Sequence, residues 1–176
     1  MAKPWKTIER IDTDEGVLEL RQRDDRDFLI TVGGLVLMNS MANRSEIVLG
    51  QLGCKHLKTH VRPRVLVGGL GMGCTLRAVL DSLPSTAEVV VAELNPVVLK
   101  WCQGPLAELT NGAANDPRVR VEITDVAELV GKTAKGDSAN KFDAIVLTST
   151  KDLIIILISS KTLSMVAGRL KRLGLP

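Results

Sequence analysis

The sequence predicts an α/β fold in which a doubly wound parallel sheet follows a small antiparallel β element. Three observations predict it. Residues 64–68 form a short apolar run that ends in glycines, which is typical of a buried parallel strand. Strand-like and helix-like segments then alternate as far as residue 147, which favours parallel strands joined by crossover helices. Before residue 43, alternating apolar residues and Gly33-Gly34 indicate antiparallel strands instead.

The N-terminal part is expected to be a hairpin element. Alternation predicts one strand over residues 17–22 and two strands over residues 28–38, with a turn at Gly33-Gly34. A helix is expected over residues 43–58, with its apolar positions at Ile47, Leu49, Leu52 and Leu57. We therefore divide the chain into a β-hairpin element, residues 1–42, and a parallel-sheet domain, residues 43–176.

The parallel-sheet domain is expected to contain strands over residues 64–68, 88–93, 119–124 and 142–147. The helix predicted over residues 73–83 has apolar residues at helical spacing, namely Leu76, Val79, Leu80 and Leu83. Asn95 is a favourable N-cap with Pro96 at the first helical position, and Gly104-Pro105 should end that helix. A short helix over residues 126–131 and a loop over residues 131–141 are expected to follow.

Composition restricts the classes of function. The net charge of +3 over 176 residues is too weak to indicate nucleic-acid binding, and the scarcity of aromatic side chains removes the stacking platforms of single-strand binders. The three cysteines form no Cys-x-x-Cys motif, so neither a disulfide framework nor a zinc site is expected. His56 and His60 are read as loop histidines, and no metal is expected. Without an apolar leader or a membrane-length apolar run, the sequence predicts a cytoplasmic protein with no membrane partner.

The glycines after the first parallel strand predict a ligand site. Gly69, Gly71 and Gly73 have the spacing G-x-G-x-G. A dinucleotide fingerprint, G-x-G-x-x-G, would need glycine where Cys74 or Leu76 stands, and no Gly-Lys-Ser/Thr follows for a phosphate-binding loop. The tighter spacing favours a nucleoside without a pyrophosphate, such as the adenosine of S-adenosylmethionine. The alternative is a tight strand-to-helix turn that binds nothing.

Two acidic residues close neighbouring strands and are expected to meet a ligand on that turn. Glu93, twenty residues after Gly73, can accept hydrogen bonds from both ribose hydroxyls. Asp125 can contact the exocyclic amine of adenine or order the edge of the pocket. The alternatives are an exposed acid at the strand end for Glu93 and a helix N-cap for Asp125.

These motifs resemble a known family. The segments PRVLVGGLGMGCTLRAVLD, AEVVVAELNPVVLKW, NDPRVRVEITDVAEL and FDAIVL resemble the spermidine synthase-like branch, the polyamine aminopropyltransferases, of the class I S-adenosylmethionine-dependent methyltransferase fold. The resemblance covers about residues 62–147, and it implies a Rossmann-like domain after a small β domain. It also implies that Gly69, Gly71 and Gly73 line the cofactor, that Glu93 holds the ribose and that Asp125 lies beside adenine.

Two departures from the family pattern bear on the motif and on the reaction. Gly71 stands at the aspartate of the family's Gly-Gly-Gly-Asp-Gly-Gly motif, and Thr148 stands where the fourth strand should deliver a catalytic aspartate. Neutral threonine cannot take up the proton of an attacking amine near neutral pH. No residue of this sequence is therefore assigned as catalytic.

The sequence after residue 147 departs from the pattern as well. Residues 148–158 fit no part of it, a helix is expected over residues 160–173, and the fold is expected to be C-terminally incomplete, as in an altered or truncated gene product. The β-branched residues Ile154, Ile155 and Ile156 should form a strand that covers the open edge of the sheet, or pair with a second chain in a homodimer.

Two functions remain open at this point. In the first, the chain binds S-adenosylmethionine or its decarboxylated form and transfers a methyl or aminopropyl group to a small-molecule acceptor that the sequence does not identify. Such chemistry depends mainly on holding donor and acceptor in line, so the missing carboxylate does not exclude it. In the second, the chain is a catalytically inactive binding or assembly module, or a truncated remnant of the family.

Overall fold

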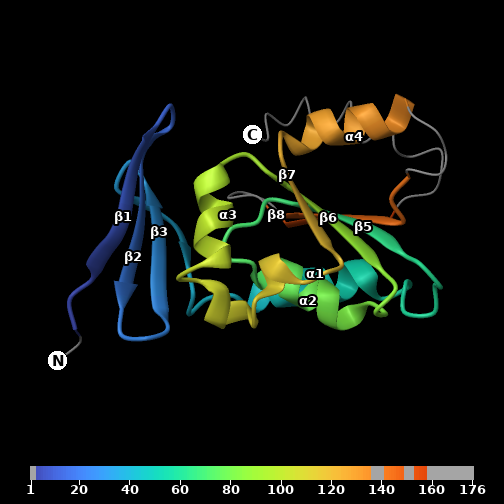
Figure 1. The fold of residues 1–176 in the computed structure, drawn as a ribbon, viewed down its shortest axis with the longest axis horizontal. Helices are drawn as coiled ribbons and strands as arrows, with labels where there is room; N and C mark the ends of the chain where they lie inside the picture. Colours follow the sequence, from blue (N-terminus) through green and yellow to red (C-terminus); the bar gives the residue numbers. More distant parts are fainter. Residues whose placement is uncertain (1–2, 136–140, 149–152, 158–176) are drawn as a thin grey trace. The chain divides into compact units, whose positions relative to one another are not determined.

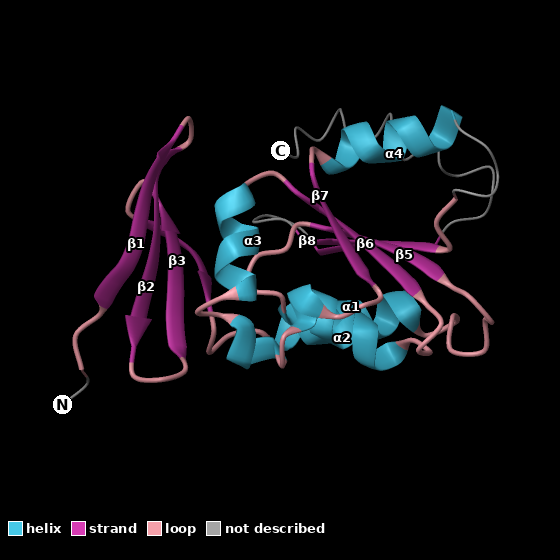
Figure 2. Ribbon diagram, in the orientation of Figure 1, coloured by secondary structure: helices cyan, strands magenta, loops and turns pink. Residues whose placement is uncertain are grey.

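The computed structural model describes residues 3–135, 141–148 and 153–157 (Figure 1). The chain divides into two compact units, Met1–Arg44 and Ser45–Pro176, and each contains its own sheet. The first sheet is antiparallel and the second is mostly parallel with helices between its strands (Figure 2). The predicted α/β class, with a separate antiparallel element before it, is therefore confirmed.

The first unit is a sheet of four antiparallel strands in the order of the sequence. Gly33 and Gly34 have φ angles of 55° and 83°, and they form the predicted turn, where a tight hairpin needs left-handed residues. The first strand was not predicted, because its two apolar residues, Ile8 and Ile11, do not alternate with a period of two. The strands are β1 (Lys6–Thr13), β2 (Gly16–Arg23), β3 (Asp27–Val32) and β4 (Leu35–Asn39).

The second unit is built on a five-stranded sheet in the order β7-β6-β5-β8-β9, in which the first four strands are parallel. Helices α1 and α2 lie on one side of the sheet, and α4 lies on the other (Figure 1). The strands are β5 (Arg64–Gly68), β6 (Glu88–Glu93), β7 (Val119–Ile123), β8 (Ala144–Thr148) and β9 (Leu153–Leu157). The helices are α1 (Arg44–Cys54), α2 (Cys74–Ser82), α3 (Pro96–Gln103), η1 (Ala107–Thr110), η2 (Ala113–Asn115) and α4 (Val126–Lys135).

The central strands are apolar on both faces, as expected for a parallel sheet covered by helices on both sides. Leu66 of β5 stands in register with Val90 of β6 and with Ile145 of β8. These three side chains belong to one buried cluster that also contains Val126 and Val130 of α4. The strands and α4 are thus held together mainly by apolar burial. Because β5, β6, β7 and β8 are parallel, their carboxyl ends lie at one edge of the sheet.

Three helix boundaries test the sequence predictions. The N-cap of α3 is confirmed, because Oδ1 of Asn95 accepts a hydrogen bond from the N–H of Val97 at 3.0 Å, with Pro96 as the first helical residue. The predicted end of α3 is also confirmed, with Gly104 at its C-cap. Helix α4 continues to Lys135, beyond the predicted residue 131, and takes up part of the predicted loop. Residues 136–140 of that loop lie outside the described residues.

The buried face of α1 differs from the prediction. Leu49 and Leu57 are buried as expected, but Ile47 and Leu52 are 37% and 50% exposed. The helix ends at Cys54 rather than at residue 58. The residues of α1 that are buried are Leu49, Gly50, Gly53 and Cys54. The spacing of large apolar residues does not reveal this face, because two of its four buried residues are glycines.

Close packing against α2 and β8 explains the two buried glycines of α1. A Cβ atom on Gly50 would lie 2.8 Å from Cβ of Ala78 and 2.9 Å from the carbonyl oxygen of Thr75, both on α2. A Cβ atom on Gly53 would lie 2.6 Å from Cγ2 of Val146 on β8. Real Cβ atoms cannot approach so closely, so only glycine at these positions allows α1 to lie where it does.

The strand predicted over Ile154–Ile156 is confirmed. Strand β9 pairs antiparallel with β8, with Thr148 opposite Leu153, and so covers the edge that β8 would otherwise expose. Pairing of this segment with a second chain stays a prediction. The helix predicted over residues 160–173 lies outside the described residues.

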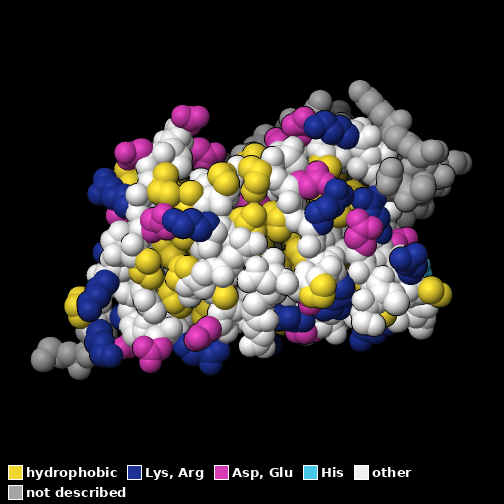
Figure 3. Space-filling view, in the orientation of Figure 1, with side chains coloured by type: hydrophobic (Ala, Val, Ile, Leu, Met, Phe, Trp, Pro, Cys, Tyr) yellow, Lys and Arg dark blue, Asp and Glu magenta, His cyan; other side chains and the backbone are white. Residues whose placement is uncertain are grey.

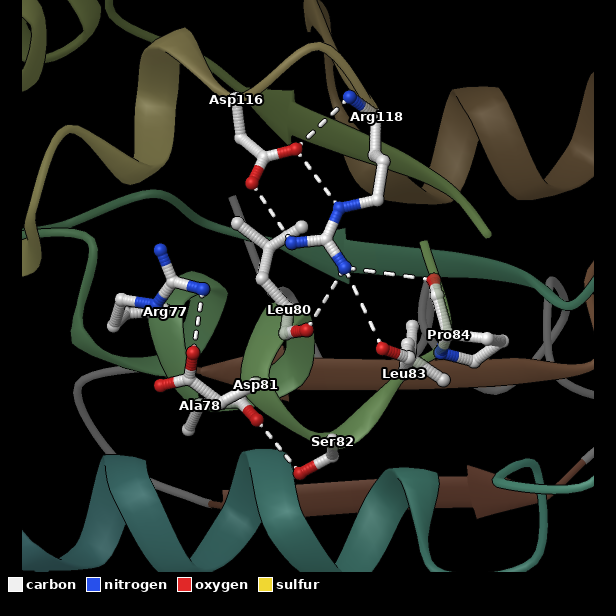
Figure 4. Close-up of polar contacts among 9 residues, drawn as sticks. All are labelled: Arg77, Ala78, Leu80, Asp81, Ser82, Leu83, Pro84, Asp116 and Arg118. Carbon is white, nitrogen blue, oxygen red and sulfur yellow. Dashed lines mark hydrogen bonds and ion pairs between the residues drawn. The ribbon is translucent and has the colours of Figure 1, made fainter. Parts of the chain in front are cut away.

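Arg118 ties the start of β7 to the end of α2 (Figure 4). Its Nε and Nη2 donate to both carboxylate oxygens of Asp116 at 2.9 and 2.8 Å. Its Nη1 donates to the carbonyl of Leu80 at 3.0 Å and to those of Leu83 and Pro84 at 3.5 Å. A cation placed on the last carbonyls of a helix satisfies groups that the helix itself leaves unpaired.

This ion pair predicts a pH-dependent stability. Hydrogen bonds from Arg118 hold the pKa of Asp116 at about 2, below its ordinary 3.8. Because the folded pKa is lowered, the stabilisation is complete above pH 4 and is lost as the pH falls toward 2. We expect Asp116→Asn to lower the free energy of unfolding by at most about 2 kcal/mol at pH 7. Urea unfolding at several pH values should show the difference from wild type vanish near pH 2.

The matched control is Asp81→Asn. The Asp81 side chain is 64% exposed and pairs with Arg77 four residues earlier on α2. Exposed helical pairs contribute roughly 0.3–0.5 kcal/mol, so this variant should unfold almost as wild type does. A difference between Asp116→Asn and wild type that stayed constant from pH 7 to pH 2 would contradict the assignment.

Candidate functional site

The glycine turn, residues 69–73, joins β5 to α2. Gly69, Gly71 and Gly73 have φ angles of 86°, 54° and 81°. All three lie in the left-handed region, which side chains other than glycine rarely adopt. The backbone of this turn therefore requires glycine at these three positions, which explains the G-x-G-x-G spacing. The residues between the glycines, Leu70 and Met72, are 3% and 2% exposed and anchor the turn to the core.

Glu93 is drawn toward the turn by hydrogen bonds. It ends β6, the neighbour of β5, and is only 8% exposed, so it is not an exposed acid at a strand end. Oε2 accepts a hydrogen bond from the N–H of Leu70 at 2.8 Å, and Oε1 accepts one from the N–H of Asn95 at 2.9 Å. An ionised carboxylate has about four lone-pair sites, so the hydrogen bonds from the described residues leave two of them for a ligand.

Asp125 lies at the same edge of the sheet, one strand further from the turn, because β7 pairs with β6. The N–H of Thr124, beside it, donates to the carbonyl of Glu93 at 3.0 Å. Oδ1 of Asp125 accepts hydrogen bonds from the N–H groups of Ala127 at 2.5 Å and Glu128 at 3.4 Å. The helix-cap alternative therefore describes what Asp125 does in this structure, and its contact with adenine stays a prediction.

Cys102 of α3 was not predicted to take part in the site. Its thiol donates to the carbonyl oxygen of Gly71 at 3.2 Å and is 1% exposed. Burial raises the pKa of this thiol to about 12, and the nearby carboxylate of Glu93 raises it further. It therefore keeps its proton at neutral pH. No local sequence signal could have found a contact between residues 31 positions apart.

Thr148 ends β8, the neighbour of β5 on the side away from β6. Leu147 pairs with Gly68 in the parallel register, so the end of β8 reaches the edge of the sheet at which the glycine turn begins. The backbone of residue 148 thus lies at the same edge of the sheet as the glycine turn, and its correspondence to the family's catalytic aspartate stays a prediction.

A separate cavity of about 620 Å³ lies at the opposite edge, where the parallel strands begin. Its lining carries four basic and two acidic side chains. Nε of Arg64 lies 3.3 Å from Oε1 of Glu88, and the backbone N–H of Arg64 donates to Oδ2 of Asp143 at 2.7 Å. Figure 3 likewise shows charged side chains of both signs interspersed over the visible face. The cavity is thus a mixed-charge rim of the sheet.

Two further features concern metals and membranes. Among the described residues, no three His, Cys, Asp or Glu side chains gather in a group that could hold a metal ion. Within the same ranges, no helix has both the length and the apolar character needed to cross a bilayer.

Comparisons with known proteins agree on one family. The model of the spermine/spermidine synthase domain matches residues 47–161. The polyamine aminopropyltransferase of Clostridium tetani is 37% identical over 95 residues, which cover 53% of this chain and 32% of that protein. The corresponding protein of Sulfurisphaera tokodaii is 31% identical over 87 residues, or 49% of this chain and 27% of that protein. The chain thus spans about a third of the length of these relatives.

Solved structures show the same fold. A spermidine synthase crystallised with the transition-state analogue AdoDATO superposes with a TM-score of 0.65 at 23% identity, over 82% of this chain and 46% of that chain. The spermidine synthase of Thermotoga maritima gives a TM-score of 0.58 at 22% identity, over 82% of this chain and 47% of that chain. At this identity the likeness establishes the fold alone.

Proposed function

The chain belongs to the spermine/spermidine synthase domain family, and on that premise we propose that it binds decarboxylated S-adenosylmethionine on the glycine turn and transfers the aminopropyl group to a polyamine. The aminopropyl donor and the amine acceptor follow from the relatives, which are polyamine aminopropyltransferases. S-adenosylmethionine itself, as a methyl donor, is the alternative ligand. The comparisons give no support to an inactive module or remnant.

The observation that supports this proposal best is the hydrogen bond from Leu70 to Glu93. It brings a buried carboxylate against the glycine turn and leaves two of its lone-pair sites open. Both ribose hydroxyls of an adenosyl group can donate to such a carboxylate, and hydrogen bonds to a charged group contribute roughly 1.5–3 kcal/mol each. Asp125, one strand further along the same edge, is the proposed neighbour of adenine.

The proposed reaction is a single displacement. The nitrogen lone pair of the acceptor amine attacks the aminopropyl carbon bonded to the sulfonium. The new C–N bond forms as the C–S bond breaks, and its electron pair returns to sulfur to give neutral methylthioadenosine. The nitrogen then loses a proton. The chain would contribute mainly by holding donor and acceptor in line, for which well-oriented reactions gain about 7–11 kcal/mol.

Calorimetric titration and product analysis test the proposal together. We expect decarboxylated S-adenosylmethionine and methylthioadenosine to bind, and methylthioadenosine to accumulate when the donor is incubated with 1,4-diaminobutane. Binding of the ligands without product would overturn the transfer reaction. Methyl transfer from S-adenosylmethionine instead would correct the donor, and absence of any binding would overturn the site.

Thr148 provides a further test of the same reaction. Since threonine cannot accept a proton near neutral pH, the amine would have to reach the site already unprotonated. We expect Thr148→Asp to raise kcat about 10-fold or more at pH 7, with little change in the affinity for methylthioadenosine, because a positioned base typically contributes 10²–10⁴-fold. Thr148→Asn is the control, because asparagine has the shape of aspartate without its charge, and this variant should not raise kcat.

A further inference from the structure

We propose that Cys102 is a positioning residue for the glycine turn, and that its thiol, together with Glu93, holds the turn in the shape that accepts the ligand. The ligand named in this inference comes from the proposed function, whereas the geometry of the turn does not depend on that function. Glu93 accepts from the N–H of Leu70, and Cys102 donates to the carbonyl of Gly71. Two side chains from different elements thus fix adjacent residues of the turn, one through its N–H and the other through its carbonyl.

The orientation of one peptide group follows from the Cys102 bond. In a trans peptide the carbonyl of one residue and the N–H of the next point in opposite directions. A carbonyl of Gly71 that points at Cys102 on α3 therefore directs the N–H of Met72 away from α3. Gly71 itself is held at a φ angle of 54°, and without a side chain of its own it depends on such outside contacts to stay there.

The turn keeps two donors free for a ligand. The N–H of Gly69 donates to the carbonyl of Ala92, and that of Gly73 donates to the carbonyl of Leu70. The N–H groups of Gly71 and Met72 have no hydrogen-bond partner among the described residues. They lie beside the first turn of α2, where unpaired N–H groups and the helix dipole both favour an electron-rich ligand atom. Loss of the Cys102 bond should therefore disorder these two donors.

The chemistry of the thiol suits a donor rather than a reactive group. Cys102 is 1% exposed, so it packs as a small apolar side chain while donating its single proton. The acceptor is the carbonyl of Gly71, a residue that has no side chain of its own with which to form a hydrogen bond. Serine at this position would keep a donor of similar shape, whereas alanine would remove the donor and leave the carbonyl of Gly71 without a partner.

Three variants separate positioning from simple packing. Cys102→Ala removes the donor, Cys102→Ser keeps one, and Cys54→Ala removes another fully buried thiol, at the end of α1. We expect Cys102→Ala to weaken methylthioadenosine binding about 5- to 10-fold, because the loss of one neutral hydrogen bond typically lowers an affinity by about that much. Cys102→Ser and Cys54→Ala should stay within about 2-fold of wild type. Equal loss of affinity in both alanine variants would overturn the proposal.

A readout without ligand keeps this inference independent of the proposed function. Amide hydrogen exchange of Leu70 and Gly73 reports how well the turn is held, since both amides are hydrogen-bonded within the site. We expect about 10-fold faster exchange in Cys102→Ala and wild-type exchange in Cys102→Ser and Cys54→Ala. Unchanged exchange in Cys102→Ala would overturn the positioning role. If wild-type protein binds no methylthioadenosine, the proposed function fails and the exchange data alone decide this inference.

Discussion

Replacing Glu93 by glutamine is expected to abolish most nucleoside binding and also to destabilise the fold. Both carboxylate oxygens accept backbone N–H groups, from Leu70 and from Asn95. Glutamine keeps the size of the side chain but presents an NH₂ group to one of those N–H groups, which leaves a buried donor unpaired. Such a donor costs about 1–3 kcal/mol, and we expect a loss of that size in the free energy of unfolding.

The loss of affinity should be larger than the loss of stability explains. The charge that would receive two ribose hydroxyls is gone, and we expect methylthioadenosine to bind about 100-fold more weakly, a change of about 3 kcal/mol. Calorimetry measures the affinity and urea unfolding measures the stability. The calorimetry is done without urea and well below the thermal unfolding midpoint of the variant, so that weak binding does not simply reflect unfolded chain.

Glu88→Gln is the matched control for this prediction. Glu88 begins the strand that Glu93 ends, and its side chain is 51% exposed and paired with Arg64. A pair this exposed contributes little, about 0–1 kcal/mol. We expect Glu88→Gln to bind methylthioadenosine as wild type does. If Glu93→Gln also bound normally, the carboxylate would have only its structural role of joining the turn to the end of β6.

The parts of the site that were predictable from the sequence are those set by local chemistry. Three glycines with a spacing of two predicted a tight turn, and each of Gly69, Gly71 and Gly73 has a positive φ. A strand-end acid predicted a carboxylate near that turn, because the carboxyl ends of parallel strands share one edge of the sheet. Glu93 lies there, joined to Leu70 by a hydrogen bond. For Asp125, local chemistry allowed two roles, and only the three-dimensional structure shows that it caps α4.

The parts that were not predictable depend on contacts between distant residues. The bond from Cys102 to Gly71 spans 31 positions, and nothing in the local pattern distinguishes Cys102 from a packing residue. The face of α1 was misassigned for a similar reason. Apolar periodicity selects large side chains, whereas this helix approaches its neighbours through Gly50 and Gly53, whose importance appears only when the partner elements are in place.

Helix α1 leads to the second large effect, an expected destabilisation of about 3 kcal/mol by Gly50→Ala. The new methyl group would lie 2.8 Å from Cβ of Ala78, 2.9 Å from the carbonyl oxygen of Thr75 and 3.1 Å from the backbone nitrogen of Val79. Two of these atoms belong to the backbone of α2, so no side chain can rotate to make room. Overpacking of this kind costs about 1–3 kcal/mol, and here it must separate two helices.

Gly131→Ala is the control, and its expected effect has the opposite sign. Gly131 also lies within a helix, α4, but a Cβ atom there would meet nothing within 4 Å. Alanine restricts the unfolded chain and is the better helix former, so we expect a stabilisation of about 0.5–1 kcal/mol. Urea unfolding of the two variants should therefore give shifts in opposite directions. Shifts of the same sign would mean that helix propensity, rather than the contact with α2, determines the effect at Gly50.

The same substitution also connects packing to the site. Thr75 and Ala78 lie on α2, whose first residue, Cys74, directly follows the glycine turn. If α2 moves away from α1 to admit a methyl group at Gly50, the N–H groups at its start move with it. We expect Gly50→Ala to weaken methylthioadenosine binding even at temperatures where the variant is fully folded, and Gly131→Ala to leave binding unchanged. Normal binding by folded Gly50→Ala would show that α2 adjusts without displacing the turn.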